Sequence, residues 1–182
     1  MKKVIYLSIF LIVSLVIISC APYDGTDQGN PPQWRLIGTV GTGTQIGDSL
    51  VLATDSNDLP VVVWQDISAG AKASAMKWNG SAWSILGNYG FTTGSATYLS
   101  LALLSNNNPV IAFQDNSASW KITVMAFTGS SWTLVGGQGF SEGQADLTCI
   151  SVGSDDKPLV AYKDSANSNK ITVQKWDAST SS

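Results

Sequence analysis

The sequence of 182 residues contains no histidine, and its other reactive residues are scarce. Glu142 is the single glutamate, Arg35 is the single arginine, and Cys20 and Cys149 are the two cysteines. Without histidine, neither a Ser/His/Asp nor a Cys/His catalytic arrangement can form, and the commonest general base and metal ligand is missing. There is also no glycine-rich phosphate loop. The sequence therefore predicts that the protein is not an enzyme and holds no metal and no cofactor.

Charged side chains are also few, at 13% of the sequence, and acidic residues outnumber basic ones by 13 to 10. An acidic surface that is poor in lysine disfavours nucleic acid as a partner. By contrast, the sequence has 17 glycines and seven tryptophans. This balance is typical of a folded β protein with many turns, and it is unlike that of a disordered chain.

The first twenty residues have the pattern of an export signal. Lys2 and Lys3 precede an apolar run from Val4 to Ile18, which is shorter than the roughly 20 residues of a membrane-spanning helix. The run leads into Ile17-Ile18-Ser19-Cys20, which resembles the lipobox of bacterial lipoproteins. An uncleaved membrane helix and an ordinary secretory signal are the two alternatives.

The lipobox resemblance implies that Cys20 is the lipidation site. In that family the thiol receives a diacylglycerol, the chain is cut just before the cysteine, and the new amine takes a further acyl chain such as palmitate. Residues 1–19 are then the signal peptide, and residues 20–33 are the lipidated cysteine and a flexible tether. Ala21 follows Cys20, and no aspartate stands there. By resemblance to Gram-negative lipoproteins, this implies the outer membrane as the location in a Gram-negative cell. In a Gram-positive cell it is the extracytoplasmic face of the plasma membrane.

A repeat of 49 residues organises residues 34–182. Four marks recur in register three times without insertion or deletion: Trp34, Trp83 and Trp132; Gly38, Gly87 and Gly136; Pro60, Pro109 and Pro158; and Asp66, Asp115 and Asp164. Such a period is characteristic of stacked structural units.

Each repeat predicts four short strands separated by Asn/Gly/Asp/Ser turns. In the middle copy the expected strands are 98–104, 109–114, 121–127 and 132–136. Four antiparallel strands per repeat of this length are typical of a β-propeller blade. The predicted fold is therefore all-β and propeller-like, with three four-stranded antiparallel blades. The third repeat lacks its last strand because Ser181 stands where tryptophan is expected, while Trp34 to Gly38 is a spare copy of that strand.

Propellers usually have four to eight blades, and three repeats fall short of that number. Three arrangements stay open. The sequence is a fragment of a longer propeller, or two chains pair as a homodimer with six blades, or three blades form an open or unusually tight arrangement.

The repeat also resembles tandem repeats in secreted and lipid-anchored bacterial proteins. The matching stretches are Asn79 to Trp83, Gly139-Phe140, Pro158 to Asp164 and Lys170 to Val173. The resemblance covers Trp34 to Trp176 and implies the propeller fold, which serves many functions.

Six aromatic residues are the candidate ligand-binding positions because sugar rings stack on aromatic faces: Trp78, Trp83, Trp120, Phe127, Trp132 and Trp176. The Gly-Ser-x-Trp turn resembles a turn in small fucose-binding propeller lectins, although the arginine ligand of that family has no repeated counterpart here. The alternative is that these rings pack within and between blades. Trp120 is the exception to the repeat, since its counterparts are Ala71 and Asn169.

Two other residue sets receive a structural interpretation. The repeated aspartates Asp66, Asp115 and Asp164 each follow a predicted strand, where aspartate commonly caps a turn. Cys149 lies within a predicted inner strand and is expected to be a small buried residue.

Together these features predict a surface-anchored lipoprotein of the cell envelope that presents a propeller to protein or glycan ligands. The alternative is a structural or assembly component of the envelope with no small ligand. An enzyme would have to rely on the three repeated aspartates.

Overall fold

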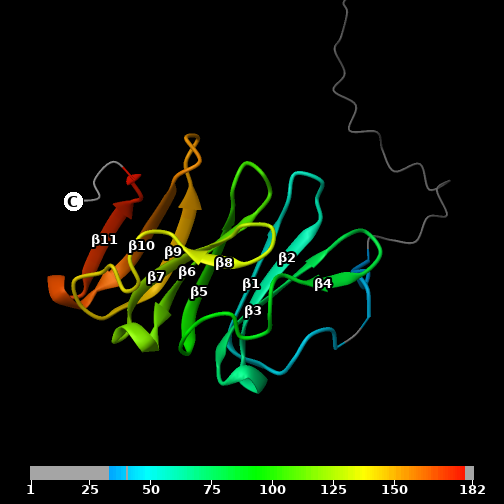
Figure 1. The fold of residues 1–182 in the computed structure, drawn as a ribbon, viewed down its shortest axis with the longest axis horizontal. Helices are drawn as coiled ribbons and strands as arrows, with labels where there is room; N and C mark the ends of the chain where they lie inside the picture. The colour runs from blue at the N-terminus through cyan, green and yellow to red at the C-terminus, as the bar shows by residue number, and fades with distance from the viewer. Residues whose placement is uncertain (1–32, 40, 179–182) are drawn as a thin grey trace, which may run out of the picture. The chain divides into compact units, whose positions relative to one another are not determined.

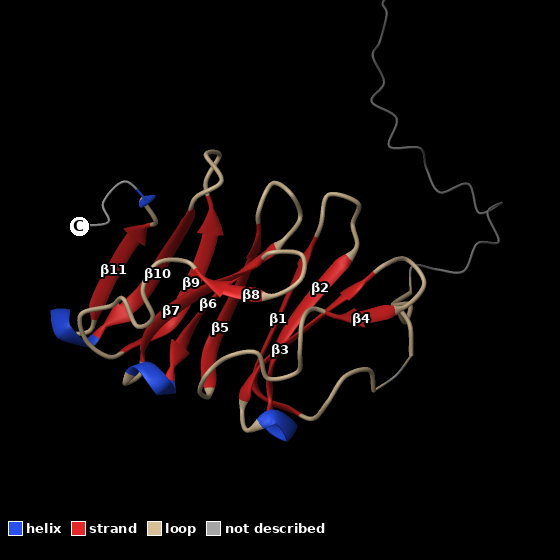
Figure 2. Ribbon diagram, viewed as in Figure 1, coloured by secondary structure: helices blue, strands red, loops and turns tan. Residues whose placement is uncertain are grey.

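Three antiparallel β-sheets follow one another along the chain (Figures 1 and 2). The computed structural model describes residues 33–39 and 41–178, and it divides the chain into the units Met1–Arg35 and Leu36–Ser182. All of the sheets lie in the second unit. The predicted signal peptide, Cys20 and all but the last residue of the predicted tether lie outside the described residues. Within these residues, no helix has the length and apolar character needed to cross a membrane.

The sheets correspond to the three repeats and are called blades A, B and C. Blade A contains β1 (Ile46–Thr54), β2 (Pro60–Asp66), β3 (Lys72–Trp78) and β4 (Trp83–Ile85). Blade B contains β5 (Ala96–Leu103), β6 (Pro109–Asp115), β7 (Lys121–Phe127) and β8 (Trp132–Leu134). Blade C contains β9 (Ala145–Val152), β10 (Pro158–Asp164) and β11 (Lys170–Lys175).

The observed strands confirm the all-β prediction and the division of each repeat. Residues 121–127 form β7 as expected, and the other strands of blade B differ from the prediction by one or two residues at one or both ends. Blade C has three strands in the described part of the chain, in agreement with the loss of the last strand from its repeat. Residues 33–39 form no strand, although they carry the spare strand sequence. A strand forms only where a neighbouring strand satisfies its backbone groups.

The repeated aspartates cap turns, as predicted. Each accepts a backbone N–H from the 3₁₀ turn that follows it, in η1 (Ile67–Ala69), η2 (Asn116–Ala118) and η3 (Ser165–Asn167). The other carboxylate oxygen accepts a hydroxyl from the third strand of the same blade, at 2.7 Å from Ser74, 2.9 Å from Thr123 and 2.8 Å from Thr172. Hydrogen bonds from Asn167 and Thr172 hold the pKa of Asp164 below its usual range. These buried carboxylates therefore join the second strand, the turn and the third strand.

The core lies between the blades, with one apolar cluster at each junction. At the junction of blades A and B, Val63, Ala73 and Ala75 pack against Ile111 and Phe113. A second cluster between blades B and C contains residues of β6, β7, β9 and β10. Figure 1 shows the three sheets side by side, with β1, β5 and β9 as neighbouring first strands. Blade B, the middle blade, is therefore covered on both faces.

The two end blades each leave one face open. Leu50 of blade A is 58% exposed, whereas its counterpart in blade B, Leu99, is 6% exposed because it packs toward blade A. Cys149 is also exposed, so the prediction that it is buried was wrong. Its neighbour Ile150 packs into the core between blades B and C, and Cys149 therefore points to the opposite face of β9, which no further blade covers.

Candidate functional site

The six predicted aromatic residues lie at two different ends of the strands. Trp78 and Trp83 are cross-strand partners with ring centroids 5.6 Å apart, and Phe127 and Trp132 repeat this pair in blade B at 5.6 Å. Trp176 follows β11 at the equivalent place in blade C. Trp120 precedes β7, so the length of this strand, about 20 Å at roughly 3.4 Å per residue, separates it from Phe127.

The paired rings join successive blades. Trp132 stacks on Phe91 with centroids 4.1 Å apart and an interplanar angle of 3°, and its indole N–H donates to the Leu86 carbonyl at 2.8 Å. Trp83 donates in the same way to the Ile37 carbonyl at 3.1 Å. Both acceptors belong to the segment that precedes the blade of the tryptophan. Trp83 and Trp132 therefore each connect their own blade to the segment that precedes it.

Glycine at the repeated position makes this close approach feasible. A Cβ at Gly38 would lie 2.9 Å from Cδ1 of Trp83, and one at Gly136 would lie 2.6 Å from a ring carbon of Trp176. Both glycines also have a φ of +79°, which a residue with a side chain rarely adopts. Gly87 lies against Trp132 as Gly38 lies against Trp83, whereas Gly136 lies against Trp176, so each repeated glycine contacts an aromatic ring with its backbone.

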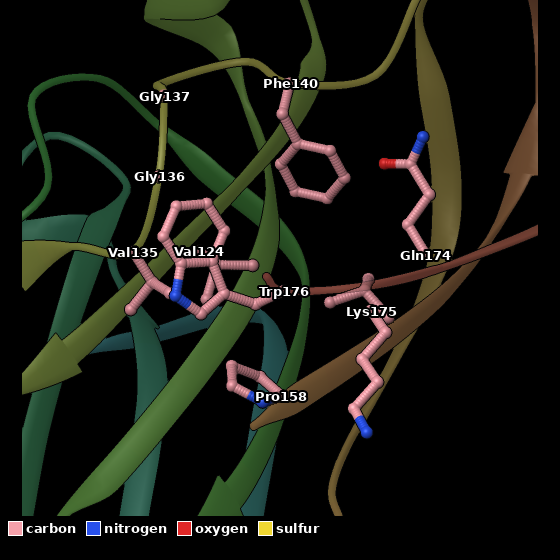
Figure 3. A pocket seen from close by; sticks show the side chains of 10 residues that line it. Val124, Val135, Gly136, Gly137, Phe140, Pro158, Gln174, Lys175 and Trp176 are labelled. Carbon is pink, nitrogen blue, oxygen red and sulfur yellow. The ribbon is translucent and has the colours of Figure 1, made fainter. Parts of the chain in front are cut away.

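An apolar groove lies between blades B and C beside Trp176 (Figure 3). It has a volume of about 180 Å³, and its lining includes Val124, Val135, Phe140, Pro158, Gln174 and Trp176. At the equivalent place between blades A and B, the ring of Trp132 packs among residues that include Leu86, Ile111 and Met125. The groove therefore corresponds in shape and lining to the space that the Trp132 ring fills between blades A and B.

A polar pocket of about 160 Å³ lies between the same two blades, lined by Gln114, Gln144, Ala145, Asp146, Lys163, Ser165 and Asn169. The side-chain amide of Gln114 donates to the Ala145 carbonyl at 2.8 Å, which links β6 to β9. The Lys163 ammonium lies 3.4 Å from Oδ2 of Asp146. Asp146 Oδ1 is buried and has no hydrogen-bond partner, and the same is true of Thr148 Oγ1 further along β9. A buried oxygen without a partner is uncommon. The Asp146 side chain is 30% exposed, and because Oδ1 is closed to solvent, Oδ2 beside Lys163 is the oxygen that a ligand can approach.

The pocket arises from a local departure from the repeat. In blade B, Thr97 and Gln114 are cross-strand partners, and the Thr97 hydroxyl donates to Gln114 Oε1 at 2.8 Å. Asp146 and Lys163 occupy the same two positions in blade C. Blade A has Asp48 and Gln65 at these positions, so a carboxylate occurs in two of the blades and Lys163 is the residue that departs from the repeat. Aligning the three repeats and looking for changes of charge would have revealed Lys163, whereas the sequence analysis had searched for aromatic residues.

Of the six predicted aromatic residues, Trp120 is the one tied to the polar pocket. Its carbonyl accepts the N–H of Ala145, a residue of the pocket lining, at 3.1 Å. Trp120 has a φ of +63°, and its side chain is 36% exposed. Its counterpart in blade C, Asn169, is itself part of the lining. The structure therefore fixes the Trp120 backbone next to the pocket wall.

The side chains of the polar pocket are suited to binding a ligand through hydrogen bonds. The described residues contain no group of three side chains suited to a metal ion. The pocket instead combines hydrogen-bond donors on Gln114 and Lys163 with an acceptor on Asp146. Such a set suits a ligand that is rich in hydroxyl groups.

Comparison with known proteins gives a general likeness to solved structures. No family model and no curated protein matches the sequence. Among solved structures, a fucose lectin from Kordia zhangzhouensis in complex with methyl-fucoside is similar over 71% of this chain and 93% of the lectin. The sequence identity is 14% and the TM-score is 0.45. A likeness of this size assigns no ligand to the chain.

Proposed function

We propose that this protein is a lipid-anchored, glycan-binding protein of the bacterial surface, and that the polar pocket between blades B and C holds the glycan. The observation that carries the proposal is the ion pair of Asp146 Oδ2 and Lys163 in a pocket whose lining also contains the Gln114 amide. A sugar hydroxyl donates to Asp146 Oδ2 and accepts from Lys163. Trp120, next to the pocket, supplies an aromatic surface for the apolar face of the sugar.

The size and charge of the pocket indicate the kind of glycan. Its volume of about 160 Å³ is below the roughly 300–1,000 Å³ of pockets for drug-sized ligands, so it suits one sugar ring. Asp146 and Lys163 carry opposite charges 3.4 Å apart and offset each other. The ligand that fits best is therefore a neutral monosaccharide unit within a longer glycan.

The proposed test is glycan-array binding of the full chain in detergent, followed by affinity measurements on the glycans that bind. Asp146→Asn removes the charge of the acceptor, and a hydrogen bond to a charged group contributes about 1.5–3 kcal/mol, so we expect affinity to fall roughly 10- to 100-fold. Asp155→Asn is the matched control because it makes the same charge change on an exposed loop, where the other repeats have Asn57 and Asn106. Array signals that are unaffected by Asp146→Asn would show that the pocket is not the site.

The anchor is proposed from the lipobox at Cys20. Two or more acyl chains hold a protein stably on a membrane, whereas one chain binds only marginally. The expected result is a membrane-extracted protein whose intact mass begins at Cys20 and includes a diacylglycerol and a further acyl chain. A Cys20→Ser variant should lose both the cleavage and the added mass. A wild-type protein that keeps residues 1–19 and a bare thiol would contradict the anchor.

The second candidate function is an assembly component of the cell envelope. The observation in its favour is the exposed apolar face of blade C, where Ile171 and Val173 are 81% and 62% exposed. A folded protein that binds no glycan on the array would favour this role.

A further inference from the structure

Blades A and C each leave one face open. These two faces correspond to the two sides of the junctions that already exist between blades A and B and between blades B and C. Ile171 and Val173 of β11 are 81% and 62% exposed, whereas their counterparts in β7, Ile122 and Val124, are 0% and 4% exposed because blade C covers them. Exposed apolar faces of this kind mark association surfaces. The open face of blade C therefore corresponds to the face of blade B that blade C covers. The open face of blade A corresponds to the face with which blade C covers blade B.

The apolar groove beside Trp176 indicates what this junction requires (Figure 3). Between blades A and B, Trp132 stacks on Phe91 and donates to the Leu86 carbonyl. The residues one repeat later are Phe140 and Val135, and both line the groove. The missing element is thus a short strand that begins with tryptophan and pairs with the outer edge of β11.

The chain carries such a strand sequence at Trp34 to Gly38, and Trp34 is fully exposed. The end of this segment already contacts blade A in the repeated manner. The Ile37 carbonyl accepts from Trp83, and Gly38 lies against Trp83 and Trp78. In the next repeat the residues in these places directly follow β4, the last strand of blade A. The segment is therefore placed as the last strand of a blade that would precede blade A.

We propose that two copies of this chain close on each other, with Trp34 to Leu36 of each copy forming the fourth strand of blade C in the other. The register follows from β7 and β8, where Phe127 pairs with Trp132 and Met125 with Leu134. Shifted by one repeat, Trp34 of one copy lies opposite Trp176 of the other, and Leu36 opposite Gln174. Trp34 then stacks on Phe140, and its indole N–H donates to the Val135 carbonyl.

The loops at the far ends of the blades support the same junction. The Ser56 N–H donates to Asn107 Oδ1 of the next blade at 3.0 Å, and the Ser105 N–H donates to Asp156 Oδ1 at 2.7 Å. The next pair in this series is Ser154 on blade C and Asp58 on blade A. Both residues of a third such contact are therefore present in the chain, Ser154 on blade C and Asp58 on blade A, the two blades with an open face.

Two copies satisfy both open faces at once. A twofold axis makes the two junctions identical and leaves no apolar end face. The result has six blades, within the four to eight that propellers commonly have.

The test is the mass of the full chain in detergent micelles, measured by native mass spectrometry and sedimentation. The wild-type protein should have twice the mass of the chain, and Trp34→Ala should weaken the pair at least tenfold. Trp120→Ala is the matched control, since it removes an exposed tryptophan away from both faces and should leave the mass unchanged. A wild-type monomer at micromolar concentration, or an open series of higher oligomers, would overturn the proposal.

A cross-link then tests the register, with Cys149 replaced by serine; Cys20 is kept because its thiol carries the proposed lipid and forms no disulfide. One chain carries Leu36→Cys and a second carries Gln174→Cys, so any disulfide between them joins two copies. We expect a disulfide-linked heterodimer on mixing and oxidation, and none when Gly80→Cys replaces Leu36→Cys. A paired wild-type protein that gives no Leu36–Gln174 cross-link would also overturn the proposal. The glycan experiment uses different residues, so either result stands without the other.

Discussion

Replacing Trp132 with alanine is expected to lower the free energy of unfolding by about 3–5 kcal/mol, the range for loss of a large aromatic side chain from a core. The ring stacks on Phe91, tilts against Phe127 and donates to the Leu86 carbonyl. Its removal leaves a cavity at the junction of blades A and B and a carbonyl without its donor. Urea unfolding followed by circular dichroism measures the change, which should also lower the melting temperature by roughly 10 °C.

The matched control for Trp132 is Trp120→Ala. Trp120 is 36% exposed and has a φ of +63°, and alanine already occupies the equivalent place in blade A, where Ala71 has a φ of +61°. We expect its effect on the free energy of unfolding to stay within about 0.5 kcal/mol, as for most surface substitutions. Equal destabilisation by the two variants would show that Trp132 does not join the blades.

Asp115→Ala is expected to be the second most damaging change, at about 3 kcal/mol. The buried carboxylate accepts from the N–H and hydroxyl of Ser117 and from the side chains of Thr123 and Gln138. Alanine leaves the buried Thr123 hydroxyl without its acceptor and removes the side-chain cap of η2.

The same unfolding measurement tests Asp115, with Asp155→Asn as the control aspartate on an exposed loop. The control should change the free energy of unfolding by less than about 0.5 kcal/mol. If Asp115→Ala unfolds at the wild-type urea concentration, then the aspartate does not hold β6, η2 and β7 together.

The strands and turns within each repeat could be predicted from the sequence because local sequence patterns determine them. Pro109 begins β6, Asp115 ends it and caps η2, and the alternation after Lys121 gives β7. All of these are local patterns, and three copies in one register confirm one another. The same alignment showed that the third repeat has no tryptophan for a fourth strand.

Features that depend on a neighbouring blade could not be predicted in this way. Cys149 has the local sequence of an inner strand, but its exposure depends on whether a blade follows blade C. The polar pocket needs the alignment of β6 with β9, which brings Gln114 to Ala145 beside the Asp146–Lys163 pair of blade C. Sequence periodicity within one repeat contains no information on these contacts between repeats.

The aromatic residues illustrate both outcomes. Stacking ability made all six of them candidates, yet the structure gives Trp132 and Phe127 a place between strands and blades, with Phe127 only 8% exposed. Trp120 has no aromatic counterpart, and it is the residue whose backbone adjoins the polar pocket. Departure from the repeat was therefore a better guide to the candidate site than membership of it.

The most direct test of the glycan-binding proposal is a crystal structure of the full chain grown with a neutral glycan selected on the array. The account predicts electron density for one sugar ring between blades B and C, with a hydroxyl within hydrogen-bond distance of Asp146 Oδ2 and a second near Lys163. Density for the glycan in the apolar groove beside Trp176, or anywhere away from Asp146, would contradict it.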